Sequence, residues 1–73
     1  MVSYRPLFIL LATRGLSKAD LRRLANISPN TMTKLRRGEE VSMTILNKIC
    51  GALGVTYGDI VEYIHSEAAT ESK

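Results

Sequence analysis

Polar and basic side chains recur at helical spacing near the middle of the chain. At about 100° per residue, four of them fall on one side of a helix: Asn30, Thr33, Lys34 and Arg37. The apolar Met32 and Leu35 fall on the other side and predict a packed face. An Asn side chain pairs bidentately with adenine, Lys donates to guanine acceptors, and a Thr methyl contacts a thymine methyl. The pattern therefore predicts a helix that reads base edges in the major groove of double-stranded DNA, with Arg37 reaching a base or a phosphate.

Two short helices joined by a tight turn are needed to position these side chains. They are predicted by the segment from residue 17 to residue 38, SKADLRRLANISPNTMTKLRRG. Ser17 and Ser28 stand where a hydroxyl caps free N–H groups, and Pro29 stands at a first helical position. Asn26 enters the left-handed region at low cost, and Gly38 ends the second helix by the same logic. We therefore expect helices over residues 18–25 and 29–37.

The rest of the chain predicts three more helices. Pro6 opens a first helix over residues 6–14, which Gly15 closes. Ser42 caps a fourth helix, which ends at Gly54. Its one-sided apolar stripe predicts core contacts: Ile45, Leu46, Ile49, Cys50 and Leu53.

A fifth helix is expected near the end of the chain. Thr56 and Asp59 form a capping-box pattern, and the helix is expected to fade near His65. Its inward residues are expected to be Ile60, Val61 and Ile64. We expect one compact all-α domain of five helices over residues 1–65, followed by a polar tail over residues 66–73, SEAATESK. We expect no strand.

Charge is distributed unevenly along the 73 residues. Residues 14–37 hold seven cationic side chains and one acidic side chain, a net charge of +6. From residue 38 onward, two lysines face six acidic side chains, a net charge of −4. Such an asymmetry steers a polyanion to one face of the molecule. A solvated helix surface is the alternative interpretation, and the two-helix pattern favours the first.

A second set of residues suits phosphate groups, because helix N-termini attract anions. Lys18 and Ser28 stand at the starts of the two helices, and Arg22 lies one turn after Lys18 on the same side. Two further arginines are weaker candidates: Arg14 and Arg36. We assign Arg23 instead to an ion pair with Asp20, three residues earlier.

The sequence has few residues suited to other kinds of site. One Cys and one His are too few for a disulfide framework or a structural zinc site, and no glycine-rich turn suits a pyrophosphate. We expect no enzyme activity, no cofactor and no small-molecule ligand. The longest apolar run, residues 7–12, is too short to span a bilayer and has no cleavage site behind it, so a cytoplasmic protein is expected.

These motifs resemble the lambda-repressor-like, XRE or Cro/CI-type helix-turn-helix transcriptional regulators, in particular their small single-domain bacterial members. The resemblance covers residues 4–65 and includes SYRPL, GLSKADLRRLANISPNTMTKLRRG, VSMTILNKICGALGV and GDIVEYI. It implies a compact helical bundle, with the second helix across the DNA backbone and the third in the major groove. By family analogy alone, repression is expected rather than activation.

The resemblance also implies roles for particular residues. The base-reading positions of the family fall on Pro29, Asn30, Thr33 and Lys34. The phosphate position falls on Lys18, with further backbone contacts around Arg37 and in the loop from Gly38 to Ser42.

Three residues depart from the family pattern. Pro29 stands where many relatives have a base-reading Gln, which leaves at most an apolar contact. Arg22 replaces the small residue usual where the two helices cross, so either the crossing distance changes or Arg22 points outward. Asn26 replaces the common turn Gly.

Two further interpretations concern protein partners. A helical module that binds protein, such as an antitoxin-like or anti-repressor partner, is the alternative function, although it does not need Lys34 and Arg37 on an exposed face. In the first helix, Ile9 falls opposite the core-facing side and Leu10 near an edge. With Tyr63 they predict a homodimer patch, and paired motifs would read half-sites about 34 Å apart.

Overall fold

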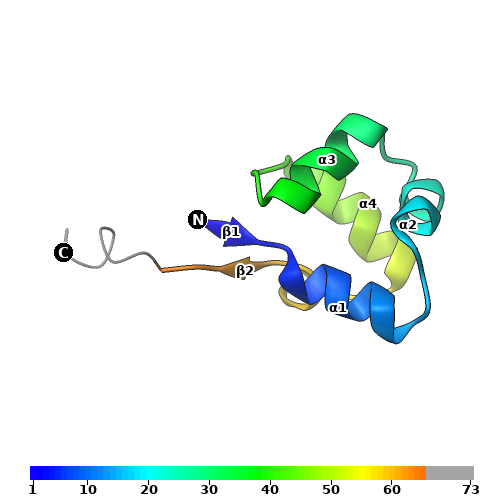
Figure 1. Cartoon of the computed structure of the whole chain (residues 1–73), viewed down its shortest axis with the longest axis horizontal. Coiled ribbons are helices and arrows are strands. Elements are labelled where there is room, and N and C mark those ends of the chain that lie inside the picture. The colour runs from blue at the N-terminus through cyan, green and yellow to red at the C-terminus, as the bar shows by residue number, and fades with distance from the viewer. Residues whose placement is uncertain (66–73) are drawn as a thin grey trace.

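The computed structural model describes residues 1–65, and Figure 1 shows a mostly helical body with a small two-stranded ladder at one end. In chain order, the elements are β1 (Val2–Ser3), α1 (Arg5–Thr13), α2 (Lys18–Ala25), α3 (Pro29–Arg37), α4 (Met43–Leu53), a single 3₁₀ turn η1 (Tyr57–Asp59) and β2 (Glu62–Tyr63). The expected all-α class is confirmed. The tail predicted over residues 66–73 lies outside the described residues.

Hydroxyl caps begin three of the four helices, as the sequence predicts. The Oγ atoms of Ser17, Ser28 and Ser42 each accept a hydrogen bond from the backbone N–H three residues later, at 3.0, 3.1 and 3.3 Å. Two of the expected ends, Asn26 and Gly38, have φ values of 55° and 74°, in the left-handed region. The predicted bounds of α2 and α3 are confirmed, whereas α1 begins and ends one residue earlier than expected.

The core gathers residues from every helix and from both ends of the described chain. It consists of Tyr4, Leu7, Leu11, Leu21, Ala25, Ile27, Met32, Leu35, Leu46, Ile49, Leu53 and Ile60. The predicted α4 stripe is confirmed, because three of its members are buried and Ile45 and Cys50 are half-buried against the core. Full burial of one such aliphatic side chain contributes about 1.5–3 kcal/mol, so this shared cluster holds the helices in place.

The expected fifth helix is wrong. The Thr56 N–H does donate to Asp59 Oδ2 at 3.0 Å, but the helical segment ends after the three residues of η1. Ile60 is buried and Val61 half-buried, whereas Ile64 is exposed. β-Branched residues lose side-chain freedom in a helix and favour extended backbone.

The expectation of no strand is also wrong, because the N-terminal residues supply a partner for this extended segment. β1 and β2 pair antiparallel, with Val2 opposite Tyr63 and Ser3 opposite Glu62. The ladder continues for one residue, since the Ile64 N–H donates to the Met1 carbonyl at 2.8 Å. Two strands from opposite ends of the described chain thus lie together beside the helical body (Figure 1).

Replacing glycine by alanine is expected to act in opposite directions at Gly38 and Gly51. At Gly38 the left-handed φ of 74° penalises a Cβ, so Gly38→Ala lowers the free energy of unfolding by about 1 kcal/mol. Gly51 lies inside α4, where an added Cβ would meet nothing within 4 Å, so Gly51→Ala raises it by about 0.5–1 kcal/mol. Denaturant unfolding measures both, and equal effects would contradict the conformational argument.

Candidate nucleic-acid interface

The outer face of α3 carries the predicted base-reading side chains. Asn30, Lys34 and Arg37 are exposed and Thr33 is half-buried, while Met32 and Leu35 are buried. The division of α3 into a packed and a presented face is therefore confirmed.

The hydroxyl of Thr33 is committed to its own helix. Thr33 Oγ1 donates to the Pro29 carbonyl oxygen at 3.1 Å, four residues earlier. This bond uses the only hydrogen that the hydroxyl can donate. The methyl group is then the part of Thr33 best suited to contact a base. Pro29 itself is exposed, and its ring offers an apolar surface at the start of α3.

A hollow of about 330 Å³ lies between α2 and α3. Its lining includes three cationic side chains, from both helices: Lys18, Arg22 and Arg36. The described residues that line it include no carboxylate. All three cations are exposed, so Arg22 points outward at the helix crossing, and its length does not disturb the packing of α2. Three cations around one hollow suit the phosphate of a nucleic-acid backbone.

Ion pairs separate the basic residues into two groups. Three arginines have carboxylate partners: Arg5 with Glu62, Arg23 with Asp20, and Arg37 with Glu39. The Asp20–Arg23 pair is the one predicted from the sequence. Hydrogen bonds from the Ser17 N–H and from Arg23 lower the pKa of Asp20 to about 2. Within residues 1–65, four cations of α2 and α3 have no ion pair: Lys18, Arg22, Lys34 and Arg36. Their charge is left to attract an external anion.

Arg14 has a structural contact away from the hollow. Its Nη1 donates to the Leu53 carbonyl at 2.6 Å, at the last residue of α4. A cation at this position satisfies a free carbonyl and interacts favourably with the helix dipole. Arg14 therefore does not join Lys18 and Arg22, and we leave it out of the interface.

The two predicted serine contacts are also partly engaged. Ser28 Oγ accepts from the Thr31 N–H and donates to Thr31 Oγ1 at 3.0 Å. Ser42 Oγ accepts from the Ile45 N–H. Ser28 is thus held as a cap, whereas its position at the start of α3 still places it where anions are favoured. The hydroxyl hydrogen of Ser42 remains available to a phosphate.

A contact that the sequence did not predict anchors the loop after α3. Tyr4 is buried, and its hydroxyl donates to the Glu39 carbonyl oxygen at 2.9 Å. Burial raises the pKa of Tyr4, which keeps the hydroxyl protonated as a donor. The SYRPL segment places an aromatic residue just before α1, but nothing local shows that its hydroxyl reaches residue 39, 35 positions away.

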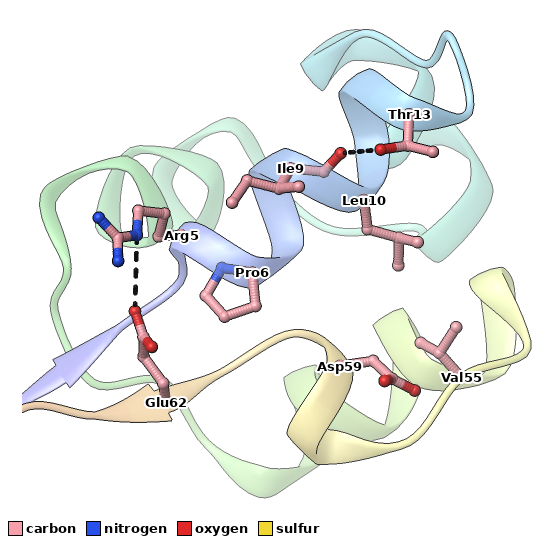
Figure 2. Close-up of a pocket in the computed structure, with 8 residues that line it drawn as sticks. All are labelled: Arg5, Pro6, Ile9, Leu10, Thr13, Val55, Asp59 and Glu62. Carbon is pink, nitrogen blue, oxygen red and sulfur yellow. Dashed lines mark hydrogen bonds and ion pairs between the residues drawn. The ribbon is translucent and has the colours of Figure 1, made fainter.

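A second hollow, of about 510 Å³, lies on the α1 side of the molecule. Figure 2 shows Leu10 pointing from α1 toward Val55, while Ile9 points along another side of the helix. Ile9 is 58% exposed, as predicted, and Leu10 is half-buried against the core. Tyr63 is 59% exposed on β2, where its ring packs edge-on against His65 at 4.7 Å. The structure thus leaves Ile9 and Tyr63 open to solvent without showing what covers them.

Comparison with known proteins identifies this arrangement. Residues 7–66 match the family model of the Cro/C1-type helix-turn-helix DNA-binding domain. The chain belongs to the Cro/C1-type helix-turn-helix family. A crystal structure of the transcriptional regulator VanUg has a similar chain, with a TM-score of 0.85 and 40% sequence identity over 89% of this chain and 87% of that chain. A search of the curated proteins found no match.

Membership of this family makes α2 and α3 the helix-turn-helix of a DNA-binding domain. Within residues 1–65, no helix has the length and apolar character needed to cross a membrane. The same part of the chain has no group of three or more His, Cys, Asp or Glu side chains placed to hold a metal ion.

Arg14 and Arg22 are expected to respond differently to replacement by Gln. Arg14→Gln removes a charge-assisted bond to the end of α4, so it lowers the free energy of unfolding by about 1 kcal/mol and leaves DNA affinity unchanged. Arg22→Gln leaves stability unchanged and weakens DNA binding several-fold, with a salt dependence reduced by about one counterion. Denaturant unfolding and binding across a salt series measure both. Equal loss of DNA affinity in the two variants would contradict the division of roles.

Proposed function

We propose that this Cro/C1-type protein is a sequence-specific regulator of transcription that inserts α3 into the major groove of DNA. The observation that carries this proposal is the position of the cationic hollow directly beside the outer face of α3. Thr33 and Pro29 belong both to the outer face of α3 and to the hollow. When α3 contacts bases, the hollow therefore lies close to the DNA phosphates. Phosphate contacts orient a protein on DNA, and base contacts specify the sequence.

The two sets of contacts fall on different residues. Bases are contacted by side chains of the α3 face: Pro29, Asn30, Thr33, Lys34 and Arg37. Phosphates are contacted by the hollow and by helix starts: Lys18, Arg22, Arg36, Ser28 and Ser42. Because Pro29 has no N–H and an apolar ring, its contribution is an apolar touch rather than a hydrogen bond.

Repression by occupying an operator is proposed by family analogy alone. A protein bound at an operator obstructs other proteins at the same DNA. We propose that this protein acts in the cytoplasm without a cofactor. Regulation would then come from protein concentration, from competition with partners or from salt-sensitive affinity.

A homodimer is proposed with Ile9, Leu10 and Tyr63 as its contact residues; Ile9 and Leu10 line one hollow together with Glu62, the neighbour of Tyr63 on β2. Ile9 and Tyr63 are large, exposed apolar residues, and neither belongs to the DNA-facing set. A two-fold axis through this surface would pair two α3 helices on half-sites about 34 Å apart.

Charge reversal on α3 tests the DNA-binding proposal against the protein-binding alternative. The double variant Lys34→Glu with Arg37→Glu is expected to weaken binding to the selected operator about 100-fold or more, because two base contacts are lost and phosphates are repelled. The fold remains intact because both side chains are exposed. The operator comes from selection of randomised duplexes at near-physiological salt, and affinity is measured by titration.

The single variant Lys34→Glu is measured beside the double variant, and Lys48→Glu is its matched control. Lys48 lies on α4, where its Nζ contacts the Asn26 carbonyl at 3.5 Å, and the charge change is the same. The control is expected to retain most of the affinity. If the double variant bound the operator as tightly as the unaltered protein, the protein-binding module would become the better function.

Ile9→Lys tests the homodimer. Adding a charge to the proposed patch is expected to lower the sedimentation mass from dimer to monomer and to weaken binding to a palindromic operator. Leu24→Lys is the control, because it makes the same apolar-to-lysine change at an exposed residue of α2, outside the hollow that Ile9 lines. If Ile9→Lys left both the sedimentation mass and the operator affinity unchanged, the patch would play no part in assembly.

A further inference from the structure

Glu39 follows α3 directly and is held by its backbone on both sides. Its N–H donates to the Lys34 carbonyl at 2.9 Å, which closes the end of the helix around Gly38. Its own carbonyl accepts from the Tyr4 hydroxyl at 2.9 Å. Because Tyr4 is 4% exposed, the core of the protein determines where the Glu39 backbone lies.

From this anchored backbone, the Glu39 side chain reaches back to α3. Glu39 Oε2 lies 3.3 Å from Arg37 Nε, and the Arg37 and Glu39 side chains are 69% and 45% exposed. A carboxylate at Nε engages one edge of the guanidinium and leaves the two Nη groups, the fork that binds guanine bidentately. An ion pair on the Nε side therefore favours orientations of Arg37 in which the two Nη groups point away from Glu39.

Stability gives little reason for this ion pair. An exposed pair contributes little to folding, and a carboxylate on a surface that meets phosphates opposes binding to any DNA. Its neighbour Glu40 shares the loop and the charge, yet it has no ion pair among residues 1–65. The feature specific to Glu39 is its contact with an arginine of the base-reading face.

We propose that Glu39 is a positioning residue that orients the Arg37 guanidinium toward a base edge, and that it favours specific over non-specific DNA. The inference rests on the proposed function and deepens it. Orientation before binding reduces the side-chain freedom that Arg37 must lose at the interface. The Glu39 carboxylate repels DNA phosphates in every complex. In complexes where Arg37 contacts only phosphates, no base contact offsets this repulsion, so these complexes are disfavoured.

The test compares Glu39→Ala with Glu40→Ala, each of which removes one carboxylate from the same loop. Affinities are measured for the selected operator and for a scrambled duplex, and each variant is also put through selection from randomised duplexes. Arg37→Ala identifies the base position that Arg37 reads. Thermal unfolding of each variant confirms that the fold is retained.

Both glutamate variants are expected to bind the scrambled duplex more tightly to the same degree, since each loses one repulsive charge. Only Glu39→Ala is expected to lower the ratio of specific to non-specific affinity, about threefold for an exposed ion pair, and to flatten the base preference that Arg37→Ala abolishes. Glu39→Gln keeps an acceptor oxygen for Arg37 Nε and is expected to restore part of that preference.

Three outcomes would overturn the inference, and they differ from one another. Matching specificity ratios in Glu39→Ala and Glu40→Ala would show that only charge matters, with the proposed function left standing. An unchanged set of base preferences in Arg37→Ala would show that Arg37 reads no base. Failure of the unaltered protein to enrich any motif would remove the proposed function together with the inference.

Discussion

The burial of Met32 and Leu35 is the interaction on which the interface depends. Both side chains enter the core shared by the four helices, and this contact sets the rotation of α3 about its own axis. Because residues step by about 100° around a helix, burying this pair turns Asn30, Lys34 and Arg37 outward. The left-handed Asn26 then sets the angle at which α3 leaves α2. A loosened core would therefore disperse the side chains that are proposed to read bases.

The distribution of charged residues also distinguishes the face that carries α3. Three of the four cations of α2 and α3 that have no ion pair within residues 1–65 line the hollow between these helices, while the acidic residues of the second half of the described chain lie on the loop, on η1 and on β2. An approaching polyanion is thus attracted to one face. Arg37 differs from Lys34 and Arg36 because it has an ion pair with Glu39. The cations that have no ion pair in the described part of the chain attract DNA, whereas the ion pair is proposed to orient Arg37.

The ladder of β1 and β2 and the Tyr4–Glu39 bond join parts of the chain that are distant in sequence. Residues 2–3 pair with residues 62–63, and Tyr4 reaches the loop after α3. Neither contact could be predicted locally. A capping-box pattern at Thr56 favours a helix, and one helical turn does form, but the chain then becomes extended, and Glu62 and Tyr63 pair with the N-terminal strand. Whether this segment is helical or extended depends on the presence of β1 beside it, which the periodicity of the sequence does not reveal.

Local chemistry determined the helix ends, the packed and presented faces of α3 and the Asp20–Arg23 pair, because caps, left-handed turn residues and contacts three or four positions apart act within a few residues. Only the tertiary structure decided that Arg14 caps α4 while Arg22 and Arg36 share a hollow with Lys18, and that Glu39 is anchored through Tyr4. The three arginines are the same residue type, and all three are exposed, so nothing in their local sequence separates their roles. What distinguishes them is which distant carbonyl or cation the packed helices bring within reach.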